Sequence, residues 1–212
     1  MNRFLPRQNL LLKPRRRRAF TLIELLCVMS LMTVLVSMTL PMLSGEKSIS
    51  SASSQMADVL ACARATALSK NLYVYVGFAE VDQSTIVYMA SSLSGEADLS
   101  SLVPLGRPLV LSNIDLCDPS EIAGRVTFTG TASSSDTVSD SDLGGFSVPY
   151  RGSALQCSKV IQFAPSGAVS IKASGASRYI QLGLAPIHPA QSKNVSLIQI
   201  AGLTGGVSIF MP

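Results

Sequence analysis

An apolar run near the start of the chain, residues 20–43, constrains folding more than any other feature. As a helix rising about 1.5 Å per residue, it would cross a hydrocarbon layer of roughly 30 Å. Its single charged residue is Glu24, and the segment before it contains seven basic residues and no acid. Because basic residues stay on the cytoplasmic side, we expect a single-pass membrane segment with a cytoplasmic N-terminus and an exported remainder.

Glu24 needs an explanation, because a carboxylate at the bilayer centre costs about 2.5–3.5 kcal/mol on insertion scales. Its place in the first helical turn is favoured by the helix dipole. Cleavage between Ala19 and Phe20 would add a second reason, because it leaves a positive α-amino group beside the carboxylate. Paired charges are tolerated in an apolar bundle, whereas unpaired charges are costly. Glu24 is therefore predicted to pair with that amine, within the chain or on a neighbouring subunit.

The sequence around this site, Arg-Ala-Phe-Thr-Leu-Ile-Glu-Leu-Leu at 18–26, resembles the prepilin cleavage and methylation motif of type IV pilins and type II secretion pseudopilins. The resemblance implies that a prepilin peptidase cuts after Ala19 and methylates the amine of Phe20. It also implies two further partners, other pilin or pseudopilin subunits and an inner-membrane assembly platform. The location that it implies is the bacterial inner membrane, with the C-terminal domain in the periplasm. Pro41 matches a helix kink common in pilins. Ala19 departs from the family, which usually has Gly before the cut.

Charge and motifs argue against nucleic-acid binding and catalysis. After the leader the chain has ten basic and 13 acidic residues, a balance of 10 − 13 = −3, whereas a nucleic-acid-binding domain needs a basic face. The chain lacks GxSxG, P-loop, GxGxxG and HExxH motifs. Its one histidine, His188, lies between two prolines and is interpreted as a surface loop residue. We therefore expect neither enzyme activity nor a cofactor.

Four segments follow from these patterns: a leader removed on processing (1–19), the transmembrane and assembly half of a pilin helix (20–43), its amphipathic half (44–71) and a β-rich globular domain (72–212). Pro41, Gly45 and the serine-rich stretch 48–54 are expected to bend or loosen the helix. Helical periodicity is then carried by an apolar stripe and ends near Lys70. The stripe consists of Ile49, Met56, Leu60, Ala63 and Ala67.

From Leu72 the apolar period changes to two, which predicts a strand over 72–78 that returns over 85–90. Later strands are predicted at 109–111, 125–129, 160–163, 169–172, 179–184, 195–201 and 206–210. One long helix followed by many short strands predicts an α+β protein with an antiparallel sheet.

The body also resembles, more loosely, minor pseudopilins related to the H subunit of type II secretion and minor type IV pilins. The resemblance is carried by residues 61–71 with the valines that follow, by Phe-Ala-Pro-Ser-Gly at 163–167 and by the stretch 198–205. The segment Tyr-Val-Tyr-Val-Gly-Phe at 73–78 is similar to pilin-like proteins of Verru-Chthon gene cassettes.

Two other features leave alternatives open. Cys117 and Cys157 lie in the exported part, where they would form a disulfide or remain buried free thiols. Residues 131–142 contain three aspartates and no large core residue, which indicates a solvated loop. A calcium loop is the alternative, but the spacing of Asp136, Asp140 and Asp142 does not match an EF-hand, and we predict no metal site.

The sequence thus favours a structural subunit that is processed by prepilin peptidase and assembles through its N-terminal helix into a type IV pilus or a type II secretion pseudopilus. Two rival hypotheses are a permanently anchored exported domain with a binding or hydrolytic activity, and a minor pilin for DNA uptake. The second rival needs basic residues near the last strands, and residues 201–212 contain none.

Overall fold

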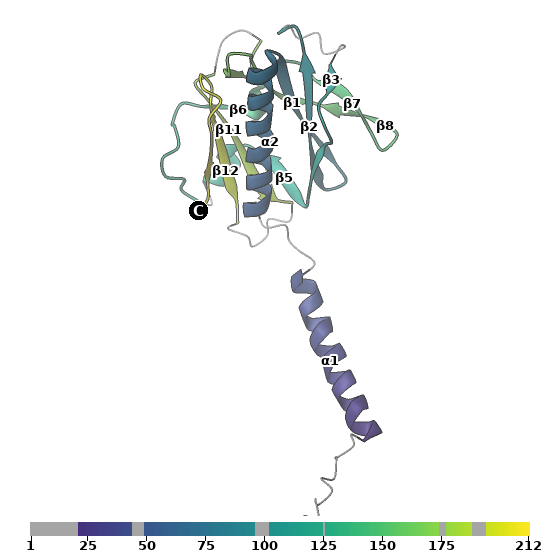
Figure 1. The fold of residues 1–212 in the computed structure, drawn as a ribbon. Coiled ribbons are helices and arrows are strands. Elements are labelled where there is room, and N and C mark those ends of the chain that lie inside the picture. The colour runs from purple at the N-terminus through teal and green to yellow at the C-terminus, as the bar shows by residue number, and fades with distance from the viewer. Residues whose placement is uncertain (1–20, 44–48, 96–101, 125, 174–176, 188–193) are drawn as a thin grey trace, which may run out of the picture. The chain divides into compact units, whose positions relative to one another are not determined.

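The computed structural model describes residues 21–43, 49–95, 102–124, 126–173, 177–187 and 194–212, with the backbone alone for 37–43. The chain divides into two compact units, residues 1–45 and 46–212. The first contains helix α1 (Leu22–Leu43), and the second contains helix α2 (Ile49–Lys70) and the strands (Figure 1). A helix followed by antiparallel β-structure confirms the predicted α+β class.

Helix α2 is amphipathic, and the predicted stripe is its buried face. All five residues of the stripe are at most 3% exposed, together with Ala52 and Ser53 between its first two members. The helix ends where predicted, since Asn71 after Lys70 has a positive φ of 52°. The serine-rich stretch does not loosen α2 within its bounds, because Ser53 donates a hydrogen bond of 2.7 Å to the Ile49 carbonyl and the helix begins at Ile49.

Among the described residues, six strands form the first sheet. Its main path runs β10–β9–β1–β2–β3, with β4 also paired to β2, and all of its pairs are antiparallel. The bounds are β1 (Tyr73–Val81), β2 (Ser84–Ser92), β3 (Val103–Pro104), β4 (Leu109–Ser112), β9 (Lys159–Phe163) and β10 (Val169–Ser170). The turn between β1 and β2 consists of Asp82 and Gln83, both at positive φ.

In the described part of the chain, five strands form a second sheet, with the path β13–β12–β11–β5 and with β6 paired to β11 in parallel. A short helix, α3 (Pro119–Ala123), follows β5 and contacts β11. The strands are β5 (Ile114–Cys117), β6 (Asp136–Thr137), β11 (Tyr179–Pro186), β12 (Ser196–Ala201) and β13 (Val207–Phe210).

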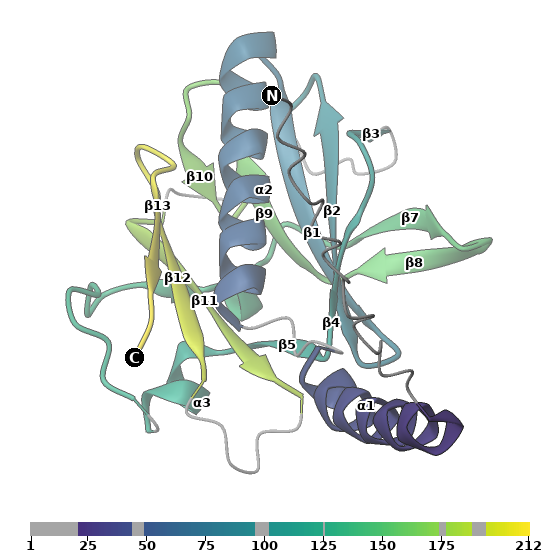
Figure 2. The same ribbon diagram turned by 60° about the horizontal axis from the view of Figure 1, so that its bottom comes forward.

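Helix α2 lies across both sheets and contacts β1 and β9 of the first and β11, β12 and β13 of the second (Figure 2). Its stripe belongs to one apolar cluster with Val74 and Phe163 of the first sheet and Ile180 and Ile198 of the second. Burial of this shared apolar surface is the main force that joins the two sheets.

A projecting hairpin, β7 (Phe146–Tyr150) and β8 (Ser153–Cys157), covers the opposite face of β1 (Figures 1 and 2). There Tyr75, Tyr88, Phe146 and Cys157 belong to a second apolar cluster. Gly77 permits this contact, because a Cβ at that position would lie 2.5 Å from Cζ of Phe146 and 2.8 Å from Cβ of Cys157. Both faces of β1 are therefore buried.

Most of the predicted strands are present, and the strand predicted at 125–129 is wrong. Residues 126–128 form no strand, and Arg125 lies outside the described residues. The amide of Val126 donates to the Ile122 carbonyl of α3, and the partly buried side chains of Val126 and Phe128 pack against a small cluster around Ile122. These two side chains are apolar because they pack against that cluster, and not because they belong to a strand.

Candidate functional site

Helix α1 begins at a side-chain cap two residues after the predicted cleavage site. The amide of Glu24 donates to the hydroxyl of Thr21 at 3.3 Å and to its carbonyl at 3.1 Å. Thr21 is thus the N-cap residue, and Glu24 is the third residue of α1, with an exposed side chain. A carboxylate in this position is favoured by the positive end of the helix dipole.

Sequence reasoning missed the role of Thr21, although a signal was present. Thr-Leu-Ile-Glu at 21–24 matches the capping-box pattern of Ser or Thr followed three residues later by Glu. Ala19 and Phe20, the predicted cleavage and methylation residues, lie outside the described residues. Helix α1 continues through Pro41 to Leu43, so no break occurs at Pro41 itself, and the kink predicted there stays a prediction.

Apart from Glu24, Ser30 and Thr33, the described side chains of α1 are apolar, and they are exposed around the whole helix. Their exposed fractions range from 81% at Leu22 to 47% at Val28. The two hydroxyls in the middle are satisfied inside the helix, because Ser30 donates to the Cys27 carbonyl and Thr33 to the Ser30 carbonyl, both at 2.8 Å. A helix that is apolar on every side needs a lipid or protein environment to bury those side chains.

Within the part of the chain that the structure describes, no helix reaches the length and apolar character needed to cross a membrane. The membrane segment predicted from the sequence, residues 20–43, lies only partly within the described residues, because Phe20 and the side chains of 37–43 fall outside them.

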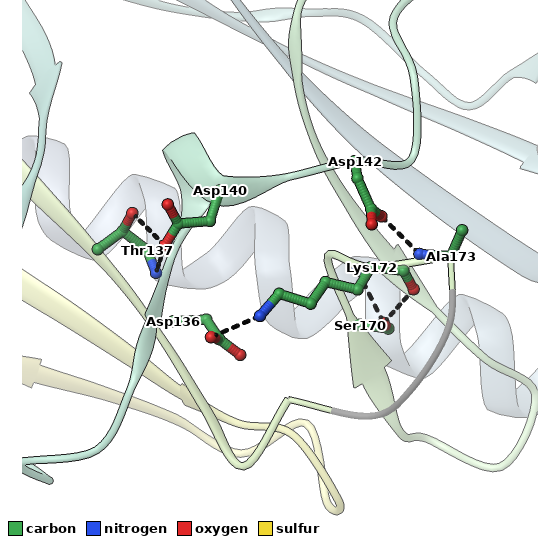
Figure 3. Close-up of polar contacts among 7 residues, drawn as sticks. All are labelled: Asp136, Thr137, Asp140, Asp142, Ser170, Lys172 and Ala173. Atoms are coloured by element: carbon green, nitrogen blue, oxygen red, sulfur yellow. Dashed lines mark hydrogen bonds and ion pairs between the residues drawn. The ribbon is translucent and has the colours of Figure 1, made fainter.

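The three aspartates of the predicted polar loop are each held by a protein donor (Figure 3). Lys172 Nζ lies 2.8 Å from Asp136 Oδ1. Asp140 accepts hydrogen bonds from the amide and hydroxyl of Thr137, at 3.0 and 2.9 Å, and Asp142 accepts one from the amide of Ala173 at 2.6 Å. A lysine ammonium therefore supplies the positive charge that a calcium ion would bring to Asp136.

The segment 131–142 also packs against the core, which the sequence did not predict. Val138 is 2% exposed and belongs to the main apolar cluster, so the interpretation of 131–142 as a loop without a large core residue is wrong. The parallel pairing of β6 with β11 and a short 3-10 turn, η2 (Val138–Asp140), place Val138 in the core. The hydrogen bond from Lys172 lowers the pKa of Asp136, and the same contact raises the pKa of Lys172.

Of the two alternatives that the sequence left open, the structure has the free thiols: Cys157 is buried and Cys117 is half-buried. The physical reason is that Cys157 packs in the cluster under the β7–β8 hairpin, whereas Cys117 packs against the separate cluster around Ile122. Burial raises the pKa of each thiol to about 11, with Glu121 adding to the effect at Cys117.

The other two cysteines, Cys27 on α1 and Cys62 on α2, are exposed free thiols. The one histidine, His188, lies outside the described residues.

Together, a capped apolar N-terminal helix with one early carboxylate and a separate β-rich domain agree with the pilin-like protein that the sequence predicts. Comparison with known families agrees, because residues 14–40 match the prokaryotic N-terminal methylation motif. This match supports a relationship to type IV pilins and pseudopilins, and the motif is that of a pilin-like substrate of prepilin peptidase. No curated protein and no solved structure matches the chain.

Proposed function

We propose that the chain is a structural subunit, and not an enzyme, that assembles through its N-terminal helix into a type IV pilus or a type II secretion pseudopilus. In this proposal residues 20–43 insert into the inner membrane, a prepilin peptidase removes residues 1–19, and the new Phe20 amine is methylated. The β-rich domain then faces the periplasm. The observation that carries the proposal is Glu24, the one charge among the exposed apolar side chains of α1, inside the matched methylation motif.

The physical argument concerns how charge is neutralised in an apolar helix bundle. A methylated amine keeps its positive charge, and Glu24 lies four residues after it, about one helical turn. The hydroxyl of Thr21 accepts from the Glu24 amide and leaves the carboxylate free to bond elsewhere. A salt bridge between this carboxylate and the amine of a neighbouring copy would fix how far adjacent helices are shifted along their axes.

The experiment separates processing from assembly. Glu24→Ala and Glu24→Gln should leave insertion and cleavage intact but reduce incorporation into filaments by roughly tenfold, since each leaves an apolar bundle with an unpaired amine. Glu24→Asp, which keeps the charge, is the matched control and should retain much of the wild-type incorporation. Membrane fractionation and intact mass measure the first two steps, and sheared filament fractions measure the third. Normal incorporation of the alanine and glutamine variants would contradict the proposal.

A further inference from the structure

A groove of about 370 Å³ lies between helix α2 and the β12–β13 hairpin. On the helix side, Ala57, Ala61 and Ala65 recur every four residues along one side of α2, and their small side chains leave room beside the helix. On the other side the lining contains Val207 of β13 but no described residue of β12, so the groove borders β13 on the side away from β12. The lining residues are Ala57, Asp58, Ala61, Arg64, Ala65, Leu68, Gly205 and Val207.

Strand β13 has an open edge on this side. The amide of Ala201 donates to the Gly206 carbonyl at 2.9 Å, so these two residues form a hydrogen-bonded pair next to the β12–β13 ladder. Hydrogen-bonded pairs alternate along an antiparallel ladder, and the register therefore directs the amides and carbonyls of Val207 and Ile209 away from β12. Among the described residues, β12 is the only strand that pairs with β13. Two donors and two acceptors thus face the open edge.

The edge of β13 also lacks the usual protection. Proteins commonly block an open edge with charged side chains or proline, and the sequence of β13, Val-Ser-Ile-Phe, has neither. Such an edge can accept an extended peptide as a further strand, held by main-chain hydrogen bonds, with alternate side chains on each face of the sheet. One face of this sheet packs against α2. Alternate side chains of an added peptide would therefore enter the groove.

Arg64 gives the groove a charge preference. Its Nε is buried and has no hydrogen-bond partner among the described residues. A buried donor without an acceptor is unfavourable, and a guanidinium forms its strongest hydrogen bonds with a carboxylate. Asp58 lines the same groove six residues earlier, a rise of about 9 Å, and would repel a second carboxylate there. The groove therefore fits a peptide with one acidic side chain and not a run of acids.

We propose that this groove binds an extended segment of another protein, which adds to β13 as a strand and pairs one carboxylate with Arg64. The side chains next to that acid would be small or apolar, because the alanines of α2 and Val207 line the groove. A second copy of this chain is a poor source of the segment, since the acids of its described strands, Glu80, Asp115 and Asp136, already belong to sheets. This contact goes beyond the assembly of N-terminal helices proposed above.

Selection from a peptide library tests the added strand. The full-length protein in detergent micelles is offered a phage library of random octapeptides, and the bound peptides should share one Asp or Glu flanked by alternating apolar residues. Ile209→Pro removes an outward amide that β12 does not use, and proline is tolerated at such an edge, so this variant should fold but enrich no such peptides. Ile209→Val keeps the amide and is the matched control. No enrichment by the wild-type protein, or equal enrichment by Ile209→Pro, would overturn the proposal.

A double-substitution cycle tests the charge pair. The Kd of the most enriched peptide should rise roughly tenfold or more for Arg64→Gln, and by a similar factor when the acid of the peptide is replaced by its amide. The two changes together should cost little more than either alone, because each removes the same pair. Lys70→Gln, at an exposed position of α2 outside the groove, should leave the Kd unchanged. Additive losses, or enriched peptides without an acid, would overturn the pairing with Arg64.

Hydrogen exchange locates the bound peptide. With the peptide at saturation, the amides of Val207 and Ile209 should exchange at least roughly tenfold more slowly, because they then donate to the added strand. Unchanged exchange at both amides, or a protein dimer at this edge that the peptide disperses, would overturn the proposed occupant. Each measurement uses protein that has not assembled. A failure to bind peptide would therefore leave the proposed function intact, and a failure to form filaments would leave this binding site intact.

Discussion

Thr21 and Glu24 form a residue pair that caps α1 and, in the proposed function, also serves assembly. Thr21 caps α1 through the Glu24 amide, so the backbone of Glu24 is fixed while its carboxylate stays exposed. The capping pattern and the single charge are both visible in the sequence. The partner of the carboxylate is not, because in the proposed function that partner is created by cleavage.

Removing the cap should loosen the first turn of α1. Thr21→Ala deletes the acceptor for the Glu24 amide, and loss of an N-cap costs about 1 kcal/mol. Hydrogen exchange of the Glu24 amide in detergent should therefore become roughly fivefold faster. Thr21→Ser keeps the hydroxyl and should exchange at the wild-type rate. Equal exchange in all three proteins would show that the hydroxyl does not cap α1.

Asp136 and Lys172 link stability of the globular domain to pH. Because the pKa of Asp136 is lowered by its hydrogen bond from Lys172, the pair stabilises the fold above the ordinary aspartate pKa of about 4. That contribution is lost as pH falls through the lowered value. Lys172→Met should therefore reduce the loss of stability measured by urea unfolding between about pH 4 and pH 2. A replacement of the exposed Lys70 by Met is the control, and an unchanged pH profile for Lys172→Met would contradict the assignment.

At the scale of elements, α2 is the part of the molecule that the sequence predicts best. Its stripe has helical spacing, and every member is buried between the two sheets. The β7–β8 hairpin was missed, because Pro149 inside β7 argues against a strand and Arg151 at φ 48° is an unusual turn residue. Val138 was missed because serines and aspartates surround it, whereas its burial depends on β11, which is distant in sequence.

Truncation of the α2 stripe should destabilise both sheets together. Leu60 is fully buried in the cluster that joins them, so Leu60→Ala should cost about 2–5 kcal/mol of unfolding free energy. Ser69→Ala, on the exposed side of the same helix, should change it by less than about 0.5 kcal/mol. Urea unfolding of the full chain in detergent measures both. A similar effect of the two substitutions would show that α2 does not hold the sheets together.

The β7–β8 hairpin should open when Gly77 acquires a side chain. Gly77→Ala places a Cβ against Phe146 and Cys157, and overpacking of this kind costs about 1–3 kcal/mol. The buried, protonated thiol of Cys157 should then react faster with a thiol reagent, because its burial and its raised pKa both protect it. Exposed Cys62 provides the internal reference. Unchanged protection of Cys157 would mean that the hairpin accommodates the methyl group.

At the scale of the whole molecule, the first unit contains the recognisable sequence motif and the second contains the packed apolar core. The methylation motif covers residues 14–40, so the support for a pilin-like protein comes from the first unit alone. The second unit has its own apolar clusters, one of which joins its strands to α2. Cysteine pairing could not be predicted from sequence, because it depends on which clusters the folded strands join. In our account the first unit drives insertion and assembly.

The central claim is that proteolysis supplies Glu24 with a cationic partner. Intact-mass spectrometry of the chain recovered from bacterial membranes that contain a prepilin peptidase tests it most directly. The account predicts a mature protein that lacks residues 1–19 and begins with N-methylated Phe20. Recovery of the chain with its arginine-rich leader still attached, as a monomer in the membrane, would contradict it.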